Sequence, residues 1–380
     1  MGRIEILKEN NMRRILQVNI NNEGGAFSLV YQVQKMIDQK EYVFDYYTMG
    51  KFNYNSVYLD IIKNNSHIYE ADLRKNRFIG HLLLPIRFYK FLKNERYEII
   101  HIHSDSSWKA ILYAFPAKIV GIKNIIIHSH STGINGEQQF FKKMCHRIAK
   151  QLISCFCTKF VACSSEAAKW MFDTQKVDVT IVKNGVNLCR FKPDMVAREQ
   201  ERRKLNYFPE NIVIGTVGDF SDTKNPMLLI EIFEQLLKDN DCFRLLFVGS
   251  GSNEKNIKEI VKKKGLESKV LFMGRTDHVE IALEAMDAFV LPSKFEGLPV
   301  SAVEAQATGL PTFLSPNITK EVAISGMAWF PHTYLDVNEW KNLIIQNLYN
   351  VKFQNITERV KNAGFDINDT VKKFTELYMR

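Results

Sequence analysis

The sequence lacks the segments that mark a secreted or membrane-spanning protein. Its first residues contain no apolar stretch of the length that a signal peptide requires, and no run reaches the roughly 18 uninterrupted apolar residues of a spanning helix. The six cysteines form neither a C-x-x-C pair nor a spacing typical of zinc ligands. We therefore expect a cytoplasmic protein with reduced thiols, which leaves peripheral attachment to the inner face of the cell membrane open.

Long blocks of one charge sign and low-complexity tails are also absent, which excludes a tail of the kind that binds nucleic acid. The net charge of +9 is nevertheless unevenly divided over the 380 residues. Residues 1–190 contain 27 Lys and Arg against 16 Asp and Glu, whereas residues 191–380 contain 24 against 26. A basic half suits a phosphate-rich ligand, an anionic membrane or nucleic acid, and an ordinary solvated surface explains it equally well.

Short β-type runs alternate with longer amphipathic segments, a pattern typical of a parallel sheet covered by helices. The predicted strands of the first half span residues 14–18, 42–47, 99–103, 124–128 and 159–162. Those of the second half span residues 212–217, 245–248, 270–272, 288–291 and 311–314. We expect an α/β fold of two doubly wound, Rossmann-like domains that face a cleft, with ligands at the carboxyl ends of the strands.

A polar, charged stretch with Pro193 and Pro209 near its edges is the predicted linker between the two domains. The expected divisions are an N-terminal domain at 1–190, the linker at 191–209, a second domain at 210–362, a helix at 363–380 that crosses back to the first domain, and an extension at 1–11 that the fold does not need.

The most informative segment follows the predicted strand at residues 288–291. A polar loop leads into a helix that is predicted to run from about Pro299 to Thr308, because Pro suits a first helical turn and Gly309 suits the stop. Backbone N–H groups at such a helix start bind a phosphate readily. Glu296 on the loop and Glu304 in the helix would then accept hydrogen bonds from sugar hydroxyls. Taken in isolation, the two residues are more simply explained as a capping carboxylate and a solvated helix residue.

This segment resembles the E-x7-E motif of glycosyltransferase family four, a family of retaining enzymes with the two-domain GT-B architecture. The similarity extends over nearly the whole chain and is to members that act in bacterial polysaccharide assembly. The other matching segments are residues 17–31 with a Gly-Gly pair, 97–103, 125–132, 161–165, 184–193 and 290–293.

The resemblance implies roles in binding the donor. Glu304 would hold the ribose hydroxyls of a nucleotide sugar, and Glu296 would contact the donor sugar and its phosphates. Neighbouring backbone would assist, at Gly297, Leu298, Pro299 and Val300. Gly24 and Gly25 would lie in a loop that a diphosphate can approach closely, because no Cβ blocks it; an ordinary turn also explains this glycine pair.

Lys224 would neutralise the departing diphosphate, although a lone lysine on a loop is more often simply solvated. The family usually has Gly-Arg where this chain has Gly218 and Asp219, so one expected cation is missing. Asp219 would repel a diphosphate unless it turns away or pairs with a base such as Lys224. Arg275 would compensate or line the base pocket, and a surface role is equally compatible with its position.

Four histidines form two pairs at strand ends, namely His101 with His103 and His128 with His130. Alternation along a strand places both members of a pair on one face, an arrangement that is compatible with a metal site. The pairs have no obvious carboxylate or cysteine partner at a strand end, although Asp105 is nearby, and we expect neither a metal nor another cofactor. The resemblance places His130 at the reacting centre, with His128 as the alternative and His103 in the cleft wall.

The resemblance implies a glycosyltransferase of the hexosyl or N-acetylhexosaminyl type that acts with retention. It would move a sugar from a nucleotide diphosphate sugar, with UDP favoured, to a hydroxyl of a lipid-linked glycan in capsular polysaccharide or exopolysaccharide assembly. His130, Glu296 and Lys224 would carry the reaction, and no residue is an evident nucleophile. Two alternatives stay open: a nucleotide-sugar epimerase of the same fold, and a non-catalytic partner subunit, which Asp219 motivates.

A basic amphipathic stretch at residues 140–150 begins with two phenylalanines, and a second basic patch lies at residues 87–96. Such stretches are typical of segments that rest on anionic lipid, and a helix with one solvated basic face accounts for them equally well. We expect partners to be the donor, the glycan acceptor and an anionic membrane surface, and not nucleic acid.

Overall fold

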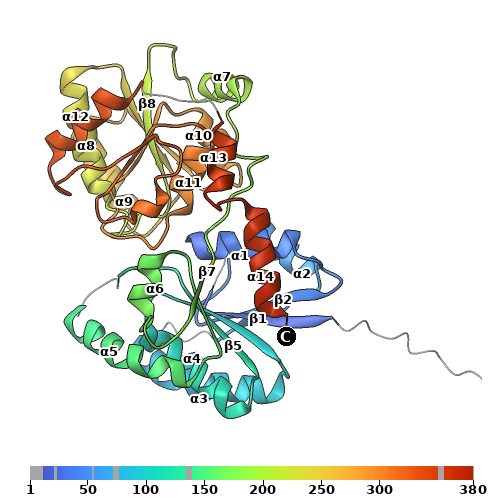
Figure 1. Ribbon diagram of the computed structural model, residues 1–380. Helices are drawn as coiled ribbons and strands as arrows, with labels where there is room; N and C mark the ends of the chain where they lie inside the picture. Colours follow the sequence, from blue (N-terminus) through green and yellow to red (C-terminus); the bar gives the residue numbers. More distant parts are fainter. Residues whose placement is uncertain are drawn as a thin grey trace, which may run out of the picture. The chain divides into compact units, whose positions relative to one another are not determined.

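The computed structural model describes residues 12–20, 24–53, 55–71, 77–133, 139–349 and 355–379. The chain divides into two compact units, each with strands at its centre and helices around them (Figure 1). The first unit comprises Met1–Val182 together with Thr370–Arg380, and the second comprises Lys183–Asp369. The extension expected at residues 1–11 lies outside the described residues.

The first unit contains a seven-stranded parallel sheet in the order β3-β2-β1-β4-β5-β6-β7. Its strands are β1 (Arg13–Val18), β2 (Tyr42–Thr48), β3 (Ile68–Glu70), β4 (Ile99–Ser104), β5 (Asn124–Ser129), β6 (Lys159–Ala162) and β7 (Val179–Ile181). Its helices are α1 (Gly24–Met36), α2 (Ser56–Lys63), α3 (Arg77–Asn94), α4 (Ser107–Val120), α5 (Gln139–Leu152), the short 3₁₀ helix η1 (Ile153–Cys155), α6 (Ser165–Met171) and the greater part of α14 (Ile367–Tyr378).

One face of this sheet is apolar and packs against helices in a buried core. Because successive strand residues point to opposite faces, Leu16, Ile100 and Ile127 share this face. They pack with Phe88 of α3 and Tyr113 of α4 in one buried cluster. Each of these five side chains is at most 1% exposed, so this layer is a closely packed apolar core.

The opposite face of the same three strands is polar at its centre. Gln17 of β1 pairs in register with His101 of β4, and His103 pairs with His128 of β5. Helix α14 packs near this face, since the ring of Tyr378 lies 5.8 Å from that of His101. The sheet thus combines an apolar core on one side with a buried polar cluster on the other.

The second unit contains a six-stranded parallel sheet in the order β10-β9-β8-β11-β12-β13. Its strands are β8 (Ile212–Val217), β9 (Phe243–Val248), β10 (Val270–Gly274), β11 (Ala288–Leu291), β12 (Thr312–Leu314) and β13 (Ala328–Trp329). Its helices are α7 (Met195–Lys204), α8 (Pro226–Asp239), α9 (Glu254–Lys263), α10 (Val279–Glu284), α11 (Val300–Ala307), the 3₁₀ helix η2 (Lys320–Val322), α12 (Val337–Asn347) and α13 (Ile356–Asn362).

The expected α/β fold with two parallel sheets is confirmed. All ten predicted strands are present, and their ends differ from the prediction by at most two residues. Three strands were not predicted, namely β3, β7 and β13. Each lies at an edge of its sheet and has only two or three residues, so it shows too few alternations to be recognised.

The stretch that the sequence assigns to a linker at 191–209 is folded differently. Asp194 caps α7 by accepting hydrogen bonds from the backbone of its first turn, and the helix belongs to the second unit. Arg202 is 9% exposed, and its Nη1 lies 3.0 Å from Asp287 Oδ2. The run of charges looks like a solvated linker in sequence, yet it contains a helix anchored by a buried arginine. The first unit also ends earlier than residue 190, at Val182.

Candidate functional site

Two loops at the carboxyl ends of β8 and β11 meet in the second unit. Lys224 Nζ, on the loop after β8, lies 2.7 Å from Glu296 Oε1, on the loop after β11. The backbone N–H of Lys294 donates to the carbonyl oxygen of Thr223 at 2.7 Å, which ties the two loops together. The side chains of Lys224 and Glu296 are only 21% and 16% exposed. The structure therefore brings two predicted site residues into one partly buried ion pair.

The loop after β8 has a shape that its sequence dictates. Asn225 caps α8 by accepting a hydrogen bond from Leu228 N, and Pro226 occupies the first helical turn. Gly249, at the end of β9, has a φ of +129°, and a Cβ there would lie 1.9 Å from the carbonyl oxygen of Gly218. Only glycine allows this approach, which holds the loop beneath Lys224.

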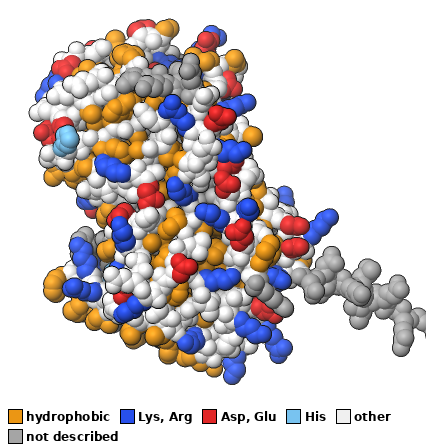
Figure 2. All heavy atoms as spheres, in the orientation of Figure 1, with side chains coloured by type: hydrophobic (Ala, Val, Ile, Leu, Met, Phe, Trp, Pro, Cys, Tyr) orange, Lys and Arg blue, Asp and Glu red, His pale blue; other side chains and the backbone are white. Residues whose placement is uncertain are grey.

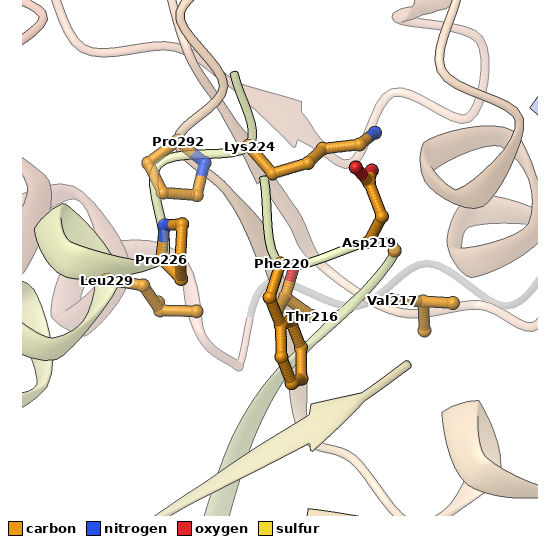
Figure 3. Close-up of a pocket in the computed structure, with 9 residues that line it drawn as sticks. Thr216, Val217, Asp219, Phe220, Lys224, Pro226, Leu229 and Pro292 are labelled. Carbon is orange, nitrogen blue, oxygen red and sulfur yellow. The ribbon is translucent and has the colours of Figure 1, made fainter. Parts of the chain in front are cut away.

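Lys224 also lies at the rim of a small pocket (Figure 3). The lining residues are Thr216, Val217, Gly218, Asp219, Phe220, Lys224, Pro226, Leu229 and Pro292. In Figure 3 the ammonium end of Lys224 points toward the carboxylate of Asp219. The lysine is thus placed among two carboxylates, because Glu296 is its partner in the ion pair. This arrangement offsets part of the repulsion that Asp219 would exert on an anion.

Glu304 is buried, which excludes the simpler explanation of a solvated helix residue. Its side chain lies in α11, where it is 8% exposed among the buried residues Ala302 and Ala305. Burial raises the pKa of Glu304 to about 7, although the nearby positive charge of Arg190 acts in the opposite direction. A buried carboxyl group whose ionised form is destabilised in this way is a candidate for ligand binding.

The start of α11 has the geometry that the sequence predicts. Pro299 precedes the helix in an extended conformation, Val300 is its first residue, and Gly309 follows its end with a φ of +85°. Leu298 is buried, and its carbonyl oxygen accepts a hydrogen bond of 2.9 Å from Asn184 Nδ2. Gly297 lies beside Glu296 on the same loop. Asn184 was not predicted to hold this loop, because it is 114 positions from Leu298 and no local pattern connects the two.

Three further predicted site residues, Gly24, Gly25 and Arg275, lie on other segments of the chain. Gly24 and Gly25 are not in a loop: they are the first residues of α1, both exposed, and Gly24 has a φ of +81°. Residues 21–23, which precede them, lie outside the described residues. The exposed Arg275 donates from Nε to Ser250 Oγ at 2.6 Å and so lies beside the loop after β9.

The four predicted histidines form one cluster in the first unit. The ring centroids of His103 and His130 are 5.1 Å apart, and those of His101 and His128 are 5.3 Å apart. Burial lowers the pKa of His101 to about 3 and that of His130 to about 4, and it holds the pKa of His103 and His128 well below 6.5. All four rings are therefore neutral near pH 7.

Three of these histidines satisfy the distance requirement of a metal site, since one ligand atom each from His101, His103 and His128 lies within 4.8 Å of the others. The rings are stacked rather than convergent: His101 lies at 29° to His103 and at 8° to His128. Lone pairs in the planes of stacked rings run side by side, whereas a tetrahedral ion needs them to meet at one point. Both nitrogens of His103 also lie within hydrogen-bonding distance of other residues.

Sequence reasoning missed two members of this cluster. Gln17 Oε1 lies 2.8 Å from His103 Nε2, and Tyr378 Oη lies 2.8 Å from His101 Nδ1. Strand alternation was the one available signal for Gln17, because it pairs in register with His101. Tyr378 is 361 positions from Gln17, so no local pattern connects them.

Known proteins similar to this chain are glycosyltransferases. The family model of "Glycosyltransferase Family 4" matches residues 57–190, and that of "Glycosyl transferases group 1" matches residues 197–359. A Bacillus subtilis protein named as a glycosyltransferase, EpsF, is 25% identical over 97% of both chains. An Escherichia coli UDP-Gal:α-D-GlcNAc-diphosphoundecaprenol α-1,3-galactosyltransferase is 26% identical over 77% of this chain and 78% of its own length.

Solved structures share the fold across both units. Anabaena HepE, in a complex with UDP and glucose, superimposes with a TM-score of 0.72 at 16% identity, over 96% of this chain and 98% of that one. Sucrose-phosphate synthase from Thermosynechococcus elongatus gives a TM-score of 0.74 at 18% identity over the same shares. At these identities the likeness shows the GT-B architecture alone. With two parallel-sheet α/β units and matching family models in both halves, the chain belongs to glycosyltransferase family four.

Proposed function

We propose that the protein transfers a hexosyl or N-acetylhexosaminyl group from a UDP-sugar to a hydroxyl of a lipid-linked glycan during polysaccharide assembly, with retention at the anomeric carbon. The observation that carries this proposal is the Lys224–Glu296 ion pair in the same unit as the buried Glu304. The names of two relatives support this choice of donor and acceptor. The Escherichia coli enzyme is named for a UDP-galactose donor and a diphosphoundecaprenol acceptor, and CapH of Staphylococcus aureus is named for capsular polysaccharide biosynthesis.

The proposed reaction proceeds on one face of the donor sugar. The bond between the anomeric carbon and the phosphate oxygen breaks, the acceptor oxygen bonds to that carbon from the same side, and the leaving phosphate takes the acceptor proton. Lys224 stabilises the negative charge that develops on the phosphate, Glu304 holds the ribose hydroxyls, and Glu296 contacts the donor sugar. His130 contacts the sugar at the reacting centre. Because these groups supply charge and position, the reaction needs no metal.

A donor screen tests this function. Purified protein is incubated with UDP-, GDP- and other nucleotide sugars, with and without a lipid-linked glycan acceptor, and released nucleotide is measured. We expect release from a UDP-sugar that depends on acceptor and persists in EDTA, because no step requires a metal. A new nucleotide sugar formed from donor alone, without free nucleotide, would identify an epimerase instead. No turnover with any donor and acceptor would favour a non-catalytic partner subunit.

We also propose that the first unit rests on an anionic membrane, where a lipid-linked acceptor would be found. Helix α4 packs against both α3 and α5. The three helices together contain ten Lys and Arg but no Asp or Glu. They also expose large apolar side chains, namely Ile79, Leu82, Ile86, Phe115, Ile119, Phe140, Phe141, Met144 and Ile148. In Figure 2 hydrophobic and basic side chains alternate along the lower edge of the molecule, where Figure 1 places these helices. No helix among the described residues is long and apolar enough to span a membrane.

Vesicle flotation tests the membrane contact. We expect binding to vesicles that contain phosphatidylglycerol at low salt, and weaker binding at high salt. Replacing Phe140 and Phe141 with Ser and reversing Lys143 and Arg147 to Glu should weaken binding on the order of 10²-fold, since each basic residue near an anionic surface contributes about 1 kcal/mol. The matched control is Leu335→Ser, which removes a side chain that is 66% exposed in the second unit. Equal binding to neutral vesicles, or none to anionic ones, would count against this contact.

A further inference from the structure

A buried chain of hydrogen bonds leads from α14 to His130 within the first unit. Gln17 Nε2 donates to the hydroxyl of Tyr378 at 3.1 Å, and Gln17 Oε1 lies 2.8 Å from His103 Nε2. His103 Nδ1 in turn lies 2.9 Å from His130 Nε2. Gln17, His103 and Tyr378 are at most 3% exposed, so water does not compete for these bonds.

The chain has a direction, because a neutral imidazole has one donor nitrogen and one acceptor nitrogen. The carbonyl oxygen of Gln17 can only accept, so His103 donates to it from Nε2. His103 Nδ1 then has a lone pair and accepts from His130 Nε2–H. This leaves His130 with an unprotonated Nδ1.

Gln17 selects this direction. If its amide were turned round, its NH₂ group would face His103, every proton in the chain would move to the other nitrogen, and His130 Nδ1 would become a donor. The hydroxyl of Tyr378 continues the same direction, since it accepts from Gln17 Nε2 and donates to His101 Nδ1 at 2.8 Å. The two directions are otherwise equally self-consistent, so one amide decides the state of a histidine two hydrogen bonds away.

The end of the chain needs a partner. His130 Nδ1 is buried, and no atom of the described part of the chain forms a hydrogen bond with it. Leaving a buried polar nitrogen unsatisfied costs about 1–3 kcal/mol. A ligand hydroxyl that donates to Nδ1 would recover this cost.

We propose that Gln17 and Tyr378 are positioning residues that hold His130 in its Nε2–H form, so that its Nδ1 accepts a hydrogen bond from a hydroxyl of the sugar substrate. The identity of that hydroxyl rests on the proposed function. The protonation state of His130 does not, because it is a property of the protein alone.

The protonation state is tested first, by long-range ¹H–¹⁵N correlation spectra of the full chain with labelled histidine at pH 7. The spectrum of His130→Asn identifies the signals of His130 by their loss. We expect wild-type protein to show a protonated Nε2 and an unprotonated Nδ1 on His130. A protonated Nδ1 would overturn the proposal, whatever the enzyme does with any donor.

The role of the two positioning residues is tested with Gln17→Leu and Tyr378→Phe. In both variants we expect His130 to populate both tautomers and kcat to fall at least about tenfold. In the other tautomer His130 presents an Nδ1–H donor where the sugar hydroxyl needs an acceptor. The donor KM should change less than kcat, since Lys224, Glu296 and Glu304, which are proposed to bind the rest of the donor, are unaltered. The matched control is Tyr46→Phe, another buried tyrosine of the first unit, whose hydroxyl bonds to Gln34.

Unchanged His130 spectra in both variants would overturn the positioning role. Altered spectra in a protein that shows no transfer with any donor would leave the positioning role standing and refute the proposed function. A merely structural role would lower stability without changing the tautomer of His130, so the spectra separate the two explanations.

Discussion

Glu304→Gln is expected to lower kcat/KM on the order of 10²-fold and, at the same time, to stabilise the second unit. A carboxylate accepts hydrogen bonds from two neighbouring ribose hydroxyls, whereas an amide offers one acceptor and two donors, so the variant loses a preorganised contact. The measurement is the rate of nucleotide release as a function of donor concentration. Glu231→Gln is the control, because Glu231 is exposed on α8.

The gain in stability follows from the direction of the pKa shift. Burial raises the pKa of Glu304 from 4.5 to about 7. Between these values the folded protein holds a proton that the unfolded protein has released, so this carboxyl reduces stability progressively as the pH rises from 4.5 to 7. The amide has no such cost, and at pH 8 the free energy of unfolding should rise by up to about 3 kcal/mol. Loss of activity together with higher stability would exclude misfolding as the cause.

Two results would contradict this assignment. Near-normal turnover in Glu304→Gln would remove the carboxylate from the donor site. A variant that loses both activity and stability would mean that Glu304 supports the packing of α11 rather than a ligand. The same raised pKa predicts that wild-type donor affinity increases from pH 6 to pH 8, as the carboxylate ionises, and that this increase is absent in the variant.

Lys224→Ala should lower kcat on the order of 10²-fold or more. The ammonium group is proposed to stabilise the departing diphosphate, and its removal leaves the carboxylates of Glu296 and Asp219 to repel that charge. Single-turnover measurements with a UDP-sugar separate this effect on chemistry from an effect on binding. The control is Lys263→Ala, which removes an exposed lysine from α9 of the same unit.

A double variant distinguishes two roles of Lys224. If the lysine served only to neutralise its partner, Lys224→Ala combined with Glu296→Gln would recover most of the lost rate. We expect no recovery, because both side chains contact the donor in the proposed reaction. Full recovery in the double variant would show that the ion pair is a structural contact.

The sequence was sufficient for the sheets because their strands are buried. Segments such as Ile212–Val217 and Ala288–Leu291 are short continuous apolar runs, which have the same appearance in any buried parallel strand. The two ends of α11 were equally predictable, since Pro299 and Gly309 mark them through local backbone preferences. Features that depend on one residue and its immediate neighbours were therefore predicted well.

The remainder depends on contacts that the sequence does not show. Glu304 has the local pattern of an ordinary helix residue, and only the packing of the second unit makes ionisation of its carboxyl group unfavourable. Arg202 likewise sits in a run of charges, and its burial against Asp287 becomes evident only when α7 is folded. The histidines were predicted to share a face, but the hydrogen-bond chain that contains them also includes Tyr378, which is 277 positions from His101 and has no local relation to it.

The interleaving of the two units imposes an order on their completion during synthesis. Residues 183–369 fold as one unit whose two ends are joined, since Val186 N donates to the carbonyl oxygen of Phe365 at 2.8 Å. Residues 370–380 return to the first unit only after that whole segment has left the ribosome. Until then the polar face of the first sheet is without Phe374 and Tyr378, whose rings pack against that of His101 in the folded protein. The first unit emerges first and yet is completed last, because the contacts of its C-terminal helix with the histidine cluster form only once the second unit has been made.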